Sequence, residues 1–413
     1  MIKKIITSVS LLLSLLSFAQ EGTSSPYSIY GIGDVRFKGT VDNRSMAGVA
    51  VEQDSIHFNL ENPASFANLK LTTFGVGGTF NSTNLKTDSA SENTRRTTFD
   101  YMAVGLPLGK FGVGFGLFPY SSVGYKITNV NGENNQRFSG SGGLNKVFFA
   151  LAYEVAPDFK IGADVQYNFG HIETVGVEYV TGVPVGTKEL NRADLSGVNF
   201  NFGAMYQTKI NEKLSLFSNL SYTLESKLSS QNSRNMGIGT FNSDFQFATI
   251  DVVEQETSKK NLTLPSEWKF GLGIGEARKW LVGAQYTMGN IGDIENSYNS
   301  SDNVSYEKSM KYRLGGYFIP DYNSFTSYAK RITYRAGLKY DRTGLVVKSE
   351  SIEDIGLNIG MGLPVSGTFS NINFGFELGR RGTTSSSLVQ ENYASFSVGL
   401  SFNDKWFVKR KFN

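Results

Sequence analysis

The sequence predicts an all-β protein: a transmembrane antiparallel β-barrel of about 14 strands with an N-terminal hatch, or plug, inside its lumen. Composition, the lack of long apolar runs and a two-residue alternation predict this class. The 413-residue chain has 45 glycines, 31 Phe and 20 Tyr, but only 9 Pro. It contains no run of about eighteen apolar residues, which excludes helical membrane spans. Its mean hydropathy of −0.22 fits a barrel, because only alternate barrel residues face lipid.

The alternation is clearest between Phe159 and Phe169, where apolar odd positions alternate with polar or small even positions. The same period returns in the ranges 198–206, 355–363, 372–378 and 394–402. Such strands would have lipid on one face and water on the other. Soluble sandwiches also alternate, so the number and spacing of the segments decide the class.

Candidate strands are predicted at 72–80, 99–106, 111–125, 144–154, 159–170, 194–207, 214–225, 264–275, 279–287, 311–318, 332–340, 354–364, 371–380 and 393–402. Short turns between them alternate with long polar connections, predicted as loops at 81–98, 126–143, 171–193, 226–263, 288–310, 341–353 and 381–392. Only 319–331 is of middle length on the short-turn side. Short periplasmic turns opposite long extracellular loops are typical of outer-membrane barrels.

The first nineteen residues predict a secretory signal peptide. Lys3 and Lys4 precede a short apolar run, and the small-x-small ending predicts cleavage after Ala19. The alternative, a retained anchor, needs a longer apolar run. The absence of cysteine excludes a lipoprotein anchor and disulfides. We therefore expect a signal peptide over 1–19, a hatch over 20–69 and a barrel over 70–413, located in the cell outer membrane.

Charge and termini suggest the surroundings of the barrel. A net charge of +3 with dispersed basic residues argues against nucleic acid as a partner. Outer-membrane lipid and lipopolysaccharide are the expected surroundings. The aromatic terminal strand 393–402, followed by Trp406 and the basic stretch 409–411, suits recognition by the barrel-assembly machinery during biogenesis. An aromatic belt with snorkelling lysines is a compatible reading.

The segment from Glu21 to Leu69 has turn-forming glycines but no sustained periodicity, so it needs an enclosure to hold it. Within it, Pro63 fixes one dihedral angle and lacks a donor, and Asn62 can cap a turn. Asn62, Pro63 and Ala64 are therefore predicted to hold a rigid bend of the hatch that gates the lumen or closes it.

Catalytic constellations are not convincing. The two histidines, His57 and His171, give no metal-binding spacing and no triad. Glycine runs at 112–116 and 271–275 superficially resemble phosphate loops, but they read more simply as strands whose lumen-facing glycines leave room for something bulky. We expect no enzyme activity, no metal and no cofactor.

Several short motifs resemble the FadL-type outer-membrane transporters of long-chain fatty acids and other hydrophobic compounds. The hatch stretch 45–50 and the Asn-Pro-Ala at 62–64 look like that family's hatch. Leu264-Pro265-Ser266 and the stretch 334–341 fit as well. The resemblance implies a monomeric, plugged, fourteen-stranded barrel with sites for hydrophobic ligands and a lateral opening at a kink in the third strand.

Two site predictions follow from this resemblance. Pro119, Tyr120 and Ser121 interrupt the third strand, where proline cannot donate to a ladder, so a lateral opening is expected there; alternatively, Pro119 only ends the strand. Parity places Arg335 and Lys339 on the lumen side, where they are candidates to bind a ligand carboxylate. Lumen arginines also commonly pair with nearby acids instead.

Two functions remain open at the level of sequence. The first is passive uptake of a hydrophobic small molecule such as a fatty acid, with plug displacement and lateral exit at the third-strand kink. The second is a structural or interaction subunit of an outer-membrane protein secretion or assembly complex, which would dock through the range 226–263 and the basic tail.

Overall fold

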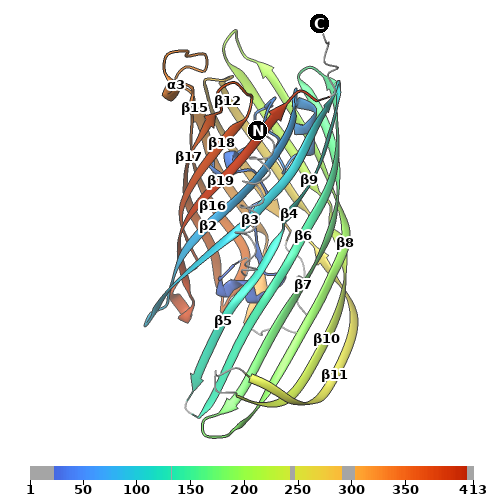
Figure 1. Ribbon diagram of the computed structural model, residues 1–413, viewed down its shortest axis with the longest axis vertical. Coiled ribbons are helices and arrows are strands. Elements are labelled where there is room, and N and C mark those ends of the chain that lie inside the picture. The colour runs from blue at the N-terminus through green and yellow to red at the C-terminus, as the bar shows by residue number, and fades with distance from the viewer. Residues whose placement is uncertain (1–22, 132, 242–246, 291–302, 407–413) are drawn as a thin grey trace, which may run out of the picture.

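The structure is a computed structural model that describes residues 23–131, 133–241, 247–290 and 303–406. The predicted signal peptide, 1–19, and the basic stretch 409–411 lie outside these residues. The strands form one elongated antiparallel barrel, and short helical elements of the N-terminal segment lie inside it (Figure 1). Among the described residues, no helix has the length and apolar character needed to cross a membrane.

The N-terminal segment, residues 23–71, holds four short elements: η1 (Pro26–Ile29), β1 (Asp34–Val35), α2 (Val41–Arg44) and η2 (Pro63–Asn68). The first half of the wall comprises β2 (Thr72–Lys86), β3 (Ser91–Leu108), β4 (Phe111–Pro119), β5 (Ser121–Asn131), β6 (Asn134–Ala156), β7 (Phe159–Val180), β8 (Val185–Lys209), β9 (Ser215–Thr223) and β10 (Ser226–Phe241). The second half comprises β11 (Phe247–Leu264), β12 (Glu267–Glu276), β13 (Trp280–Gly289), β14 (Val304–Tyr306), β15 (Ser309–Phe318), β16 (Thr333–Val347), β17 (Glu350–Pro364), β18 (Asn371–Arg381) and β19 (Gln390–Asp404). Two further short helices are α3 (Tyr328–Arg331) and η3 (Ser385–Ser387).

These wall segments make a closed barrel of 14 strands, which confirms the predicted fold class. Four of the strands consist of two consecutive segments each: β4 with β5, β9 with β10, β11 with β12, and β14 with β15. The last strand, β19, pairs antiparallel with the first, β2, from Gln390 opposite Lys86 to Asp404 opposite Thr72. Closure leaves no free strand edge at this seam, as a bilayer requires, because unpaired backbone groups are not tolerated in its apolar core.

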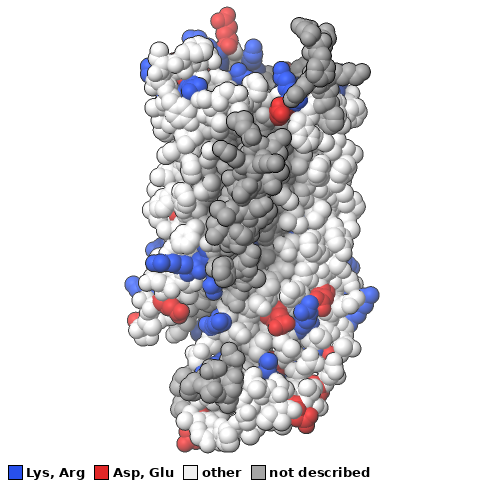
Figure 2. Space-filling view, in the orientation of Figure 1, with Lys and Arg blue, Asp and Glu red and all other residues white. Residues whose placement is uncertain are grey.

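The two ends of the barrel differ. Short turns lie at the end that carries α3, and the long hairpins lie at the opposite end (Figure 1). Outer-membrane barrels have short turns on the periplasmic side, so we assign the α3 end to the periplasm. Figure 2 shows charged side chains gathered towards the two ends of one face, with few between them. The exposed apolar side chains of the wall include Phe149 of β6, Leu272 of β12 and Leu357 of β17.

The predicted long loops are wrong for much of the chain, because strands continue through them. Strands β6, β7 and β8 run for 23, 22 and 25 residues, whereas a tilted strand crosses a bilayer in roughly 9–11. The described parts of 126–143, 171–193 and 226–263 are therefore largely paired strand beyond the membrane. Outside the bilayer the outward face need not be apolar, so the alternation that predicts strands disappears there.

The extended part of the wall has its own apolar interior. Ile32 of the N-terminal segment packs there against Val123 of β5, Ile172 of β7, Leu195 of β8 and Leu228 of β10. Each of these side chains is at most 5% exposed. The hydrophobic effect therefore holds the start of the N-terminal segment inside the extracellular half of the barrel.

Near the periplasmic end, the wall approaches the N-terminal segment so closely that only glycine fits. A Cβ on Gly162 of β7 would lie 2.6 Å from the backbone nitrogen of Ala64. A Cβ on Gly203 of β8 would lie 2.0 Å from Asn62 Oδ1. Real Cβ atoms do not come this close to other atoms, so the two glycines let η2 lie directly on the wall.

We expect Gly162→Ala to displace η2 without preventing barrel insertion, because the pairing of the wall strands does not depend on this contact. Vesicles containing the variant should leak small polar solutes faster than vesicles containing the wild type. Gly176→Ala is the matched control, since its Cβ would meet only ring atoms of Phe138 at 3.5 Å. Equal leakage from the two variants would contradict the expectation.

Candidate functional site

The N-terminal segment begins in the extracellular half of the lumen. The Ser25 side chain caps η1 by accepting from the Tyr27 backbone nitrogen, and Pro26 follows as the first helical residue. The Tyr27 hydroxyl donates to the backbone oxygen of Val389, at 2.6 Å, next to the start of β19. Local capping and one long-range hydrogen bond thus fix this end of the segment against the wall.

Asn62 fixes the other end of the segment and the predicted bend. Its Oδ1 accepts from the Ala64 backbone nitrogen at 3.0 Å, which caps η2, and Pro63 is the first residue of η2. Its Nδ2 donates to the backbone oxygens of Ala204 and Leu220, each at 3.1 Å, on β8 and β9. Asn62, Pro63 and Ala64 therefore form a bend bound to the wall; that this bend is a gate stays a prediction.

Glu61, next to this bend, is a functional residue that the sequence reasoning missed. Its carboxylate accepts from Lys269 Nζ of β12 at 3.1 Å and from Gln285 Nε2 of β13 at 2.9 Å. Its side chain is 8% exposed. Burial raises the pKa of this carboxyl, but Lys269 and Arg313 lower it by more, so the pKa lies below its ordinary value. Glu61 therefore stays charged and holds the segment to two neighbouring strands.

A second anchor lies in the middle of the lumen, around Asp100 of β3. Arg36 and Arg44 of the N-terminal segment each place a guanidinium nitrogen 3.5 Å from this carboxylate. The Asp100 side chain is only 2% exposed. Further along the lumen, Arg381 of β18 donates to Asp34 Oδ1 at 2.6 Å. Buried charges of the segment and the wall thus compensate one another at several levels.

The third strand is interrupted at the predicted position. β4 ends at Pro119 and β5 begins at Ser121, with Tyr120 between them. β3 pairs with β4 only from Met102 to Leu108, and no described β3 residue before Met102 pairs with β5. The ladder between β3 and β5 is therefore missing in this part of the wall. Whether Pro119, Tyr120 and Ser121 form an opening stays a prediction.

The N-terminal segment covers this interruption from inside. β1 pairs with β5, with Asp34 opposite Ser122 and Val35 opposite Ser121. The Arg36 backbone nitrogen donates to the Tyr120 oxygen at 2.9 Å. Backbone groups that β3 leaves unpaired thus find partners on the segment, as a water-free wall requires.

The two predicted carboxylate binders both face the lumen but border different cavities. Lys339 Nζ lies 3.0 Å from Asp354 Oδ2 and 2.7 Å from Glu377 Oε1, so two carboxylates already neutralise it. Arg335 donates to Asn373 Oδ1 at 3.0 Å and borders a separate cavity at the periplasmic end of the lumen. The structure does not bring Arg335 and Lys339 together, and a ligand role for either stays a prediction.

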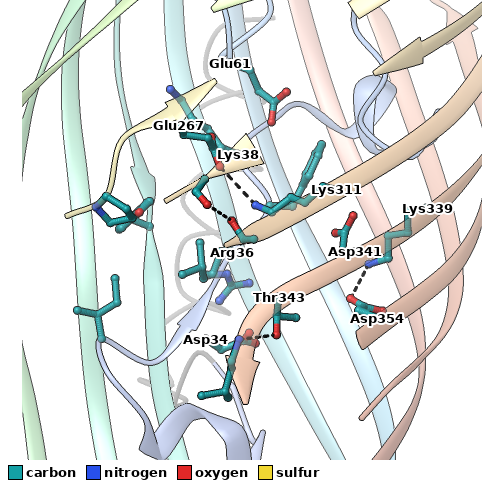
Figure 3. A pocket seen from close by; sticks show the side chains of 18 of the residues that line it. Asp34, Arg36, Lys38, Glu61, Glu267, Lys311, Lys339, Asp341, Thr343 and Asp354 are labelled. Carbon is teal, nitrogen blue, oxygen red and sulfur yellow. Dashed lines mark hydrogen bonds and ion pairs between the residues drawn. The ribbon is translucent and has the colours of Figure 1, made fainter. Parts of the chain in front are cut away.

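The N-terminal segment is bordered by two cavities. The inner cavity, of about 270 Å³, is lined by aromatic and charged side chains, several of which are labelled in Figure 3. It is bordered by Glu267, Lys311 and Asp341, besides Lys339. The periplasmic cavity, of about 980 Å³, is lined by residues 49–59 of the segment and by the periplasmic turns. A purely apolar ligand would meet charged groups throughout the inner cavity.

Two lysines of the inner cavity are further residues that the sequence reasoning missed. The Lys38 ammonium lies 5.4 Å from the centroid of the Phe118 ring, and Lys146 Nζ lies 3.8 Å from that of Tyr120. Lys146 also donates to Gln166 Oε1 at 3.1 Å. Among the described residues, neither lysine has a carboxylate within ion-pair distance. The inward parity of Lys146 on its strand was the available sequence signal.

The periplasmic cavity holds a titratable cluster of the N-terminal segment. Asp54 Oδ2 lies 2.8 Å from His57 Nδ1. Burial raises the pKa of Asp54, but His57 lowers it by more, to about 2, and Asp54 in turn raises the pKa of His57 despite its burial. Burial raises the pKa of the nearby Glu52 carboxyl to about 7. Within the described part of the chain, no group of three or more acidic, His or Cys side chains could hold a metal.

We expect Glu61→Ala to loosen the N-terminal segment by breaking its buried ion pair with Lys269. The expected cost is about 3 kcal/mol, the low end for a buried pair, because Lys269 keeps a second partner, Glu267, at 3.0 Å. The population of the displaced segment should rise roughly hundredfold. Limited proteolysis of the segment in the folded barrel measures this rise. The control Glu276→Ala removes an exposed ion pair with Lys279 and should change nothing. An unchanged cleavage rate in Glu61→Ala would contradict the assigned anchor.

The fold is shared with solved structures of two toluene transporters and of a FadL homologue. The toluene transporter TodX of Pseudomonas putida has a TM-score of 0.57 at 14% identity, with 91% of this chain and 100% of that chain covered. The toluene transporter TbuX of Ralstonia pickettii has a TM-score of 0.56 at 15% identity, covering 89% and 98%. A Pseudomonas aeruginosa FadL homologue has a TM-score of 0.57 at 11% identity, covering 90% and 99%.

At these identities the likeness shows a shared barrel fold, and neither a role nor a substrate. Two of these neighbours are named as toluene transporters and the third as a FadL homologue. No curated protein matches the sequence. The sequence profile of the BamG family matches residues 1–413. Because that match spans the whole chain, the protein belongs to the BamG family.

Proposed function

We propose that the protein is a subunit of an outer-membrane protein assembly complex, in which the N-terminal segment acts as a lasting plug. The observation that carries this proposal is the fastening of the segment to strands all around the lumen. The anchors on β3 and β12 are buried ion pairs, the anchor on β18 is a half-buried ion pair, and β7, β8 and β9 add hydrogen bonds. The family name also suggests a link to barrel assembly.

Energetics favour a closed lumen. Displacement of the segment would separate several ion pairs together and would leave wall charges such as Asp100 without their partners on the segment. A ligand can displace the segment only if it binds the barrel with the segment displaced more tightly than the barrel with the segment in place, by at least the free energy of displacement. Moving an apolar molecule past the charged inner cavity adds the cost of stripping water from those charges. A barrel held shut in this way is better suited to presenting surfaces than to conducting solutes.

The surfaces available for this role lie at both ends of the barrel. On the extracellular side, β10 and β11 pair from Ser226 opposite Leu264 to Phe241 opposite Phe247, within the range 226–263 that is expected from the sequence to dock a partner. Exposed apolar side chains on it include Ile250, Val252 and Val253. Such residues are expensive to leave in water and are typical of contact surfaces.

Isolation from native outer membranes in mild detergent tests the proposal. We expect the protein to purify in constant ratio with the barrel-assembly machinery, and its depletion to lower the amounts of other outer-membrane barrels. Recovery as a lone barrel, with normal levels of those barrels after depletion, would contradict it. The comparison needs a control barrel of similar abundance that carries the same tag.

A second candidate, uptake of a hydrophobic small molecule, is favoured by one specific observation. The missing ladder between β3 and β5 lies beside Lys38 and Lys146, so an amphiphile with an anionic head could bind there and leave sideways into the bilayer. Burying an acyl chain gains about 0.8 kcal/mol per methylene. Under this proposal the N-terminal segment moves, and β1 leaves β5.

For this second candidate, calorimetry with dodecanoate and the purified barrel should show saturable binding that the double variant Lys38→Met and Lys146→Met weakens roughly tenfold or more, because both ammonium groups are lost. Lys126→Met, an exposed lysine of β5, is the control. Absence of saturable binding by the wild type, together with absence of co-purified lipid, would eliminate the uptake function.

A further inference from the structure

One periplasmic turn differs from its neighbours. Residues 319–332, between β15 and β16, form a loop that contains α3, and we call it the aromatic loop. Three of its aromatic side chains face solvent: Tyr322 is 42% exposed, Tyr328 44% and Phe325 101%. In Figure 1 the loop that carries α3 projects past the ends of β15 and β16, the strands that it joins. A fully solvated phenylalanine at the tip of a loop requires an explanation.

Hydrogen bonds fix the conformation of the loop. The Asp321 backbone nitrogen donates to the Lys330 oxygen at 2.9 Å, which closes the loop at its base. The Tyr328 hydroxyl donates to the Pro364 oxygen, at 3.0 Å, on the neighbouring β17. Three further hydrogen bonds hold the loop: the Ser324 backbone nitrogen donates to the Asp321 oxygen, the Ser327 backbone nitrogen to Ser324 Oγ, and the Tyr334 hydroxyl to the Ala329 oxygen. The Arg278 guanidinium also lies over the Tyr322 ring. The exposed ring of Phe325 is thus presented on a preorganised support, which lowers the entropy cost of binding.

The aromatic belt of the membrane does not account for Phe325. Belt positions on these two strands are taken by Phe318, 51% exposed at the end of β15, and Tyr334, 41% exposed at the start of β16. Phe325 follows the end of β15 by seven residues. On its inner side, the loop contributes Tyr322 and Arg331 to the lining of the periplasmic cavity. The loop therefore borders the periplasmic mouth of the barrel.

The charge around the loop is positive. Lys330 and Arg331 belong to the loop, and Arg278 and Lys279 lie on the adjacent turn between β12 and β13. Among the described residues of these two turns, the acids are Glu276, which pairs with Lys279 at 3.0 Å, and Asp321. With Asp321 counted, Arg278, Lys330 and Arg331 leave a net charge of +2 beside an exposed aromatic side chain. Arginine and aromatic residues together are the composition of interface hot spots.

We propose that the aromatic loop docks a soluble periplasmic protein domain that offers an apolar pocket for Phe325 and an acidic rim for the surrounding cations. This inference rests on the proposed function and names the periplasmic partner class of that assembly subunit. Burial of one phenylalanine side chain stabilises a contact by about 1.5–3 kcal/mol, which suits an anchor. The cations around it would set orientation and speed association.

Site-specific photocrosslinking in cells tests the docking. A photoreactive phenylalanine analogue at position 325 should capture one soluble periplasmic protein with an acidic patch. The same analogue at Phe369, 57% exposed on the neighbouring turn between β17 and β18, is the matched control and should not capture it. The double variant Lys330→Glu and Arg331→Glu should abolish capture from position 325.

Binding of that purified partner to the barrel in vesicles then gives the affinity. We expect Phe325→Ser to weaken it roughly tenfold or more, Phe369→Ser to leave it unchanged, and added salt to weaken the wild-type complex. Equal affinity of the wild type and Phe325→Ser would overturn the inference while co-purification with membrane partners still supports the proposed function. If the wild type recovers no partner of any kind, the proposed function fails with it.

A lipid occupant is distinguished by fluorescence. In vesicles of phosphatidylethanolamine and phosphatidylglycerol, Phe325→Trp should add emission that brominated lipids do not quench. Quenching of that added emission would place residue 325 in the bilayer and overturn the docking of a protein. The wild type, with its three tryptophans, supplies the background emission.

Discussion

A bilayer has no water to satisfy backbone donors and acceptors, and the rest of this structure depends on that constraint. It requires the closed ladder from β2 to β19 and makes any missing pairing expensive. The second half of the third strand, β5, is not paired with β3, and the N-terminal segment supplies β1 to pair with β5 in its place. Backbone pairing and the filled lumen are therefore parts of one solution, because the wall is incomplete without the segment.

Charge reinforces this arrangement. Wall residues such as Asp100 and Lys269 face a lumen from which much of the water is excluded, and each meets a charge of opposite sign on the segment. A buried charge without a partner would be far more costly than these pairs. Wall glycines at 162 and 203 then allow the backbone of η2 to lie against the strands. The ion pairs and the glycines of the wall, which lack side chains, together define a single position for the segment.

The sequence predicted the membrane-crossing half of the barrel well, since lipid imposes strict alternation there, as in residues 159–169. It failed beyond the bilayer, where β7 continues to Val180 without that requirement. For the site, Asn62 was recognised through its local turn chemistry. Glu61 and Lys38 were missed, because their partners lie on strands far along the chain, and single-sequence patterns do not carry such pairings.

The seam between β2 and β19 has a consequence for biogenesis. Residues 23–71 are synthesised before every wall strand, and β19 is synthesised last. Tyr27 is bound near the extracellular half of the lumen, and the segment joins β2 at the periplasmic end. Zipping of the final strand onto the first, with the segment already in place, would enclose it in a single step. An assembly pathway of this kind has to hold the leading segment until the trailing strand arrives.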